Sequence, residues 1–116
     1  MSRAQRYRLT LRLGPTVEHA RFRSLTEALA ALEERLGELG RSTRRESVDL
    51  RHRRIEPVEQ VAARGEIAGP RGLRGGVDVR GDGSTEAFTG RIRRRLVAQG
   101  PEETACQALR RVLEPD

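Results

Sequence analysis

Residues 7–13 read Tyr-Arg-Leu-Thr-Leu-Arg-Leu, and they alternate apolar and polar side chains without interruption. Because successive side chains of a β-strand point to opposite faces, this stretch predicts a strand with one face in a core and the other in solvent. Gly14-Pro15-Thr16 predicts a turn, and residues 17–23 predict an antiparallel return strand with Ala20 and Phe22 facing inward. A hairpin with one apolar face therefore opens the fold.

A helix over residues 24–39 is expected to cover that apolar face. Ser24 and Glu27 have the spacing of a capping box, which satisfies free backbone amides at the start of a helix. Leucines recur from there at three- and four-residue intervals, as Leu25, Leu29, Leu32, Leu36 and Leu39. Gly40 stands where a left-handed C-terminal cap would end the helix.

The middle of the chain is expected to add more strands. Residues 41–56 show little periodicity and predict a basic, flexible connector. Alternation over residues 61–67 predicts a strand with Ala63, Gly65 and Ile67 on one face. Residues 69–76 contain four glycines and predict a flexible loop, after which residues 77–79 begin another strand.

Residues 85–97 fit two kinds of secondary structure. Phe88, Ile92 and Leu96 have helical spacing, whereas the preceding turn, Thr89 and the mid-segment Gly90 favour a strand with Phe88 in the core.

The last element is predicted to be a helix over residues 101–113. Pro101 is tolerated in a first helical turn, and Glu102 and Glu103 suit the positive end of the helix dipole. Its buried stripe would consist of Ala105, Cys106, Leu109, Val112 and Leu113.

These elements predict one α+β domain that spans residues 1–116. Two helices, over about 24–39 and 101–113, would pack on one face of a four- or five-stranded, mostly antiparallel sheet, because this buries every apolar stripe. The other face of the sheet would remain open. A chain of 116 residues is too short for two domains of ordinary size.

The chain is basic, with a net charge of +6, and all 23 basic residues are arginine. Arginine codons are GC-rich, so the genome of a high-GC bacterium would give this bias without selection on the protein. The charge is nevertheless unevenly distributed, since residues 1–23 hold six arginines and one glutamate while residues 24–40 hold four glutamates and one arginine. Such blocks raise the local potential toward polyanions such as RNA, DNA or acidic protein surfaces.

The expected compartment is the cytoplasm, with no membrane partner. No apolar run is long enough to span a bilayer, and the N-terminal residues Met-Ser-Arg-Ala-Gln-Arg lack the apolar stretch of a signal peptide. The single cysteine, Cys106, also favours an intracellular protein.

Arginines gather in two segments that would suit phosphate contacts, because a guanidinium can bind phosphate oxygens through two parallel hydrogen bonds. One is the polar face of the predicted hairpin, and the other follows residue 90. The candidate nucleic-acid-binding residues are Arg6, Arg8, Arg12, His19, Arg21, Arg23, Arg91, Arg93, Arg94 and Arg95. The alternative is a solvated strand face, or an edge strand protected from aggregation by its charge.

The aromatic residues argue against recognition by base stacking. Tyr7, Phe22 and Phe88 are the three aromatics, and alternation predicts that all of them point into the core. Single-stranded nucleic acid is usually stacked on exposed aromatic side chains. Contact with the backbone of a duplex or of a folded RNA is therefore the expected mode.

Motifs for catalysis, metals and cofactors are absent from the sequence. There is no Gly-x-Ser-x-Gly elbow, phosphate-binding loop or dinucleotide fingerprint, and two histidines with one cysteine lack the spacing of metal ligands. Cys106 would need His19 or His52 as a base, yet it lies on the apolar stripe of a predicted helix. No cofactor or metal is expected, and an enzyme is the least supported class.

Two classes of function are left. The first is a non-catalytic binding module that forms a homo-oligomer or binds another protein, since association stabilises a small domain that is poor in aromatics. The second is sequence-nonspecific binding to the backbone of RNA or DNA through arginine-rich strand faces.

Overall fold

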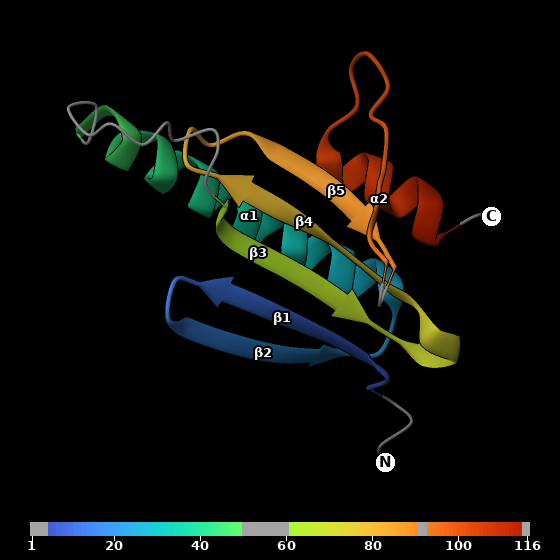
Figure 1. The fold of residues 1–116 in the computed structure, drawn as a ribbon. Helices are drawn as coiled ribbons and strands as arrows, with labels where there is room; N and C mark the ends of the chain where they lie inside the picture. Colours follow the sequence, from blue (N-terminus) through green and yellow to red (C-terminus); the bar gives the residue numbers. More distant parts are fainter. Residues whose placement is uncertain (1–4, 50–60, 91–92, 115–116) are drawn as a thin grey trace.

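The computed structural model describes residues 5–49, 61–90 and 93–114, and for residues 40–49 and 61 it describes the backbone only. The elements follow one another as β1 (Tyr7–Leu13), β2 (Thr16–Phe22), α1 (Leu25–Asp49), β3 (Val61–Ala68), a 3₁₀ turn (Pro70–Gly72), β4 (Arg74–Arg80), β5 (Thr85–Thr89), β6 (Arg95–Leu96) and α2 (Ala105–Leu113). The strands form one sheet in the order β2-β1-β3-β4-β5-β6, and all neighbours are antiparallel (Figure 1).

Both helices lie on the same face of this sheet. Helix α1 packs against β1, β2, β3 and β4, and α2 packs against β4 and β5. The predicted α+β architecture is therefore confirmed, with six strands in place of four or five. None of the described helices is both long enough and apolar enough to cross a membrane.

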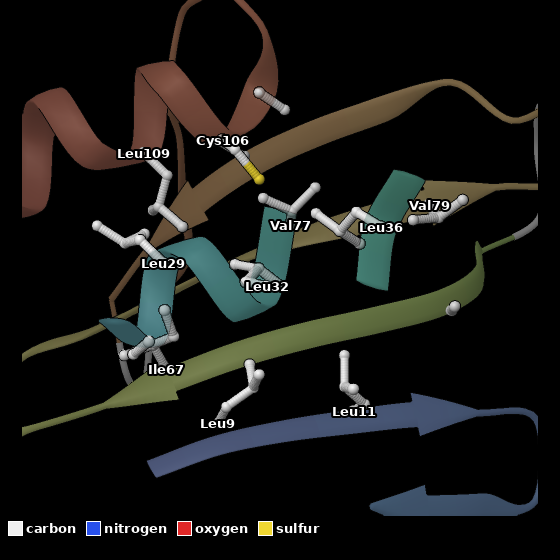
Figure 2. Close-up of a cluster of buried hydrophobic side chains, with 14 of the residues drawn as sticks. Leu9, Leu11, Leu29, Leu32, Leu36, Ile67, Val77, Val79, Cys106 and Leu109 are labelled. Atoms are coloured by element: carbon white, nitrogen blue, oxygen red, sulfur yellow. The ribbon is translucent and has the colours of Figure 1, made fainter. Parts of the chain in front are cut away.

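The core lies between the helices and the sheet. Figure 2 shows Leu9 and Leu11 of β1 beneath the leucines of α1, with Leu109 of α2 on the other side of the cluster. Leu29 and Leu32 are 1% and 0% exposed, which confirms the predicted apolar stripe of α1. Burying a leucine side chain contributes about 1.5–3 kcal/mol, so this stripe holds the helix on the sheet.

The first hairpin matches its prediction closely. Its seven pairs run without a bulge from Tyr7 opposite Phe22 to Leu13 opposite Thr16. Gly14 has a φ of +62°, and Pro15 requires a negative φ, which together select a turn with glycine in its first central position. This turn suits the right-handed twist of the two strands.

Helix α1 is longer than predicted. It continues through Gly40, which lacks the expected left-handed φ, and ends at Asp49, so residues 41–49 of the predicted connector are helical. One glycine costs a helix only about 1 kcal/mol relative to alanine, while arginine and glutamate are good helix formers. The rest of the predicted connector, residues 50–56, lies outside the described residues.

The predicted loop over residues 69–76 is wrong in its second half, because β4 already starts at Arg74. Gly75 and Gly76 are buried strand residues at points of close packing. A Cβ at Gly75 would lie 2.9 Å from Leu109 Cδ1, and a Cβ at Gly76 would overlap the Gly65 carbonyl oxygen and approach Phe88 Cζ to 2.8 Å. These glycines therefore permit contact between layers and strands.

Strands β5 and β6 lie within segment 85–97, which confirms the favoured strand at both ends of it. Strand β5 ends at Thr89, and Gly90 follows with a φ of +104°, a conformation that reverses the chain toward β6. Ile92 lies outside the described residues.

The last helix starts at Ala105, later than the predicted start at residue 101. The Thr104 hydroxyl accepts a hydrogen bond from Gln107 N at 3.0 Å, and Gln107 Oε1 accepts one from Thr104 N at 2.8 Å. This capping box starts the helix more effectively than a proline in the first turn would. Glu103 instead closes the preceding turn by accepting a hydrogen bond from Gly100 N at 2.9 Å.

Candidate functional site

The open face of the sheet carries the predicted hairpin residues. Leu9 and Leu11 point to the helices, so the alternating Arg8, Thr10 and Arg12 point the other way. On β2, Arg21 stands opposite Arg8, and His19 stands opposite Thr10. Four exposed basic side chains thus share this face with Val17, and we refer to Arg8, Arg12, His19 and Arg21 as the hairpin basic surface.

Arg6 and Arg23 flank this surface. Both are exposed and lie just outside the ends of β1 and β2. The backbone N–H of Arg23 donates a hydrogen bond to Glu27 Oε1 at 3.3 Å, which ties the end of β2 to the start of α1.

His19 links the two strands of the hairpin basic surface. The Arg8 guanidinium donates to His19 Nδ1 at 3.3 Å, and Thr10 Oγ1 lies 3.2 Å from the same nitrogen. A guanidinium can only donate, so Nδ1 is the acceptor in the contact with Arg8. His19 therefore connects Arg8 of β1 to β2.

The arginines of the central strands are engaged by carboxylates. Arg64 binds Asp78 through two hydrogen bonds, Nε to Oδ1 at 2.5 Å and Nη2 to Oδ2 at 3.1 Å. Hydrogen bonding to Asp78 is the main cause that raises the pKa of Arg64. Arg74 Nε lies 3.7 Å from Glu66 Oε2, and Arg80 pairs with Glu86 on β5. These pairs neutralise the middle of the open face.

The hairpin basic surface lacks such partners. Within the described residues, Arg8, Arg12 and Arg21 have no carboxylate within 4.0 Å. Glu18, the acidic residue of β2, faces the helices and pairs with Arg35 of α1 at 3.1 Å. The positive charge of the hairpin is therefore left for solvent or for an anion.

The position of Phe88 corrects a prediction. Phe88 pairs with Gly76, one position away from the buried pair of Ala87 and Val77, so its ring lies on the open face and not toward the helices. It is only 1% exposed, because the guanidinium carbons of Arg94 and Arg64 lie 4.4 Å and 5.6 Å from the ring centre. Tyr7 and Phe22 pack against the core as predicted.

This covered ring bears on recognition. A base could stack on Phe88 only after Arg94 moved away, since cation–π contacts occupy the ring. The described part of the open face consequently presents no exposed aromatic side chain.

The second predicted arginine block is separated from the first. Arg91 lies outside the described residues, Arg93 and Arg95 are exposed, and Arg94 Nη1 lies 3.9 Å from Asp78 Oδ2. Strand β6 is at the opposite edge of the sheet from β2, four strand spacings from β1. This separation is about 19 Å, so the two blocks do not form one continuous surface.

Among the described residues, Cys106 has no histidine beside it. It is buried on α2 beside Leu29 and Glu33 of α1, whereas His19 is on the open face of the sheet and His52 lies outside the described residues. Burial first, and then the charge of Glu33, raise the pKa of this thiol from 9.0 to about 12. A thiol in this state is a poor nucleophile.

The described residues contain no group of three His, Cys, Asp or Glu side chains placed to hold a metal ion.

Two features of the structure were not predicted from the sequence. The Arg74–Glu66 pair would have emerged from cross-strand pairing if residues 74–76 had been assigned to a strand, and the Arg64–Asp78 pair required only the register of β3 and β4. A hollow between β2 and α1, lined by Leu9, Ala20 and Phe22 among others, was also not predicted.

Comparison with known proteins adds no relationship: the chain matches no protein-family model, no curated protein and no solved structure.

Proposed function

We propose that this protein is a non-catalytic module that binds the sugar–phosphate backbone of RNA or DNA through the hairpin basic surface. The observation that carries the proposal is the unequal pairing of arginines on the open face. Arg64, Arg74 and Arg80 have carboxylate partners, while Arg8, Arg12 and Arg21 have none among the described residues. If arginine content were only compositional, we would expect no such division between hairpin and central strands.

The spacing of the basic side chains supports contacts with more than one phosphate. Arg8 and Arg12 are four residues apart on β1, which separates them by about 14 Å, and Arg21 is directly opposite Arg8 at about 5 Å. The side chains are exposed, so their guanidinium groups are free to adopt the paired geometry that phosphate oxygens require.

The same surface favours a structured nucleic acid over a bare single strand. Its exposed residues provide charge and hydrogen-bond donors, and Phe88 is covered by Arg94. Backbone contacts position a protein without reading bases. The expected ligand is therefore a duplex or a folded RNA, bound with little sequence preference.

The test is a fluorescence-polarisation titration of a labelled RNA hairpin and a DNA duplex at two salt concentrations. Three arginine–phosphate contacts give a slope of about −2.7 for log K against log salt, so affinity should fall about 40-fold between ~50 and ~200 mM salt. Arg12→Gln should reduce the slope by about 0.9 and weaken binding similarly for all sequences.

Arg110→Gln is the matched control, because it removes one positive charge from α2 in the helical layer. The proposal requires a larger loss of affinity and of salt slope for Arg12→Gln than for Arg110→Gln. Equal effects of the two variants, or no binding by the wild type at either salt concentration, would contradict it.

A further inference from the structure

The two edges of the sheet differ in how they are protected. Strand β6 has two residues, whereas β2 has seven, contains no proline and pairs with β1 without a bulge. Natural proteins usually shorten, bend or interrupt an exposed edge, since its free backbone groups would otherwise pair with another chain. β2 has one charge that points to the helix side, Glu18, and Arg35 neutralises it at 3.1 Å.

The backbone groups that β2 presents at its free edge follow from the hairpin. In a two-residue turn the closing pair, Leu13 and Thr16, is hydrogen-bonded, and bonding pairs then alternate along the ladder. The N–H and C=O groups of Val17, His19 and Arg21 consequently point away from β1. Three evenly spaced residues thus offer both a donor and an acceptor to an added strand.

We propose that a second copy of this chain pairs with this edge, β2 against β2, antiparallel about a twofold axis at His19. This register pairs all seven residues, with His19 opposite His19 at the axis, and on either side of it a large side chain lies opposite a small one: Phe22 opposite Thr16, Arg21 opposite Val17, and Glu18 opposite Ala20. Val17, which is 42% exposed in the single chain, is covered by the Arg21 stem of the second copy.

Like charges or a shorter overlap disfavour the other registers. An axis at Glu18 sets two carboxylates directly opposite each other, and an axis at Arg21 does the same with two guanidinium groups, which is destabilising. An axis at Ala20 avoids like charges but pairs only residues 18–22. The twofold register at His19 also places the second copy beside the hollow between β2 and α1, which Ala20, Phe22 and the charged residues Glu18, Glu34 and Arg35 line.

The proposed dimer should depend on salt concentration in a characteristic way. Pairing at β2 joins two hairpin basic surfaces on one continuous face, so the two copies repel each other through Arg8, Arg12 and Arg21. Added salt screens this repulsion and should strengthen the dimer. Nucleic-acid binding has the opposite salt dependence, so the two proposals succeed or fail separately.

Disulfide trapping tests the register in a Cys106→Ala background without nucleic acid. His19→Cys places two thiols across the axis with Cα atoms about 5.5 Å apart, within the range of a disulfide. Under mild oxidation we expect this variant to form a covalent dimer. Thr10→Cys is the matched control, since it lies in the same row one strand inward, about 14 Å from its copy. Cross-linking of Ala20→Cys or Glu18→Cys in preference to His19→Cys would overturn the register.

Sedimentation of the wild type and of Val17→Pro tests the edge itself. Proline at Val17 removes an N–H that points to solvent in the single chain, so the hairpin should still fold, as circular dichroism can verify. The dimer dissociation constant should rise at least ~10-fold, because symmetry removes two intermolecular hydrogen bonds. A wild type that stays monomeric at ~100 μM in both low and high salt would overturn the proposal.

Discussion

Replacing Gly76 with alanine tests the packing of the open face directly. An added Cβ would overlap the Gly65 carbonyl oxygen, lie 2.8 Å from Phe88 Cζ and lie 3.1 Å from Glu66 Cα. Two of these three atoms belong to the backbone of β3, so neither can rotate out of the way. The Phe88 ring is 1% exposed and held by Arg94, so it too has little room to move.

The expected cost is that of overpacking, about 1–3 kcal/mol. At about 2.1 cal/mol/K per residue, a chain of 116 residues has an unfolding entropy near 0.24 kcal/mol/K, so the Tm should fall by about 4–12 °C. Gly100→Ala is the control: its Cβ would find only ordinary contacts, 3.6 Å from Glu103 Oε1 and 3.7 Å from Glu103 Cβ.

Differential scanning calorimetry of both variants gives the comparison. Gly100→Ala should change the stability by less than about 1 kcal/mol, because its contacts are ordinary and alanine restricts the unfolded chain. The contact with Phe88 exists because its ring lies on the open face, whereas the contacts with Gly65 and Glu66 are with backbone and do not depend on the ring. A Gly76→Ala variant as stable as Gly100→Ala would refute the close packing of β3, β4 and Phe88 at this position.

Two further predictions concern titratable groups. Hydrogen bonds from Arg111 and from the Gly100 N–H lower the pKa of Glu103 from 4.5 to about 2, so this carboxylate stabilises the fold above pH 4.5 and loses its effect as the pH falls toward 2. Thermal melts should therefore show Glu103→Gln less stable than the wild type at pH 6, with the difference vanishing at low pH. For Cys106, a rise in pKa from 9.0 to about 12 reduces the thiolate population about a thousandfold, so a thiol reagent at pH 8 should react far faster after denaturation than before. Rapid labelling of the native protein would show that α2 does not bury this residue.

Local sequence patterns were sufficient to predict an element where one face of that element lies in the core. The alternation of residues 7–13 and the leucine stripe of residues 25–36 predicted β1 and the first part of α1, because burial imposes the period of each structure. The sharing of one face by Arg8, Arg12, His19 and Arg21 followed from the same alternation once the hairpin register was assumed.

Two of the failures, at Gly75–Gly76 and at Phe88, have their cause in contacts between elements. Gly75 and Gly76 have the local pattern of a loop, but they are strand residues because Leu109 and Phe88 occupy the space of their side chains. Phe88 has the apolarity of a core residue, and two arginines bury it on the opposite face. Arg94 lies near Phe88 in the sequence, whereas Leu109 and Arg64 lie far along the chain from the residues that they contact.

The two proposed activities use the same arginines, so they would be thermodynamically linked. In a β2–β2 dimer, Arg8, Arg12 and Arg21 of both copies lie on one face, and their mutual repulsion opposes association. A polyanion bound across that face would neutralise the repulsion and strengthen the dimer. By reciprocity, dimerisation would then strengthen polyanion binding by the same factor. Such coupling would give this small domain cooperative binding to long nucleic acids, although a single hairpin basic surface provides only three arginine contacts.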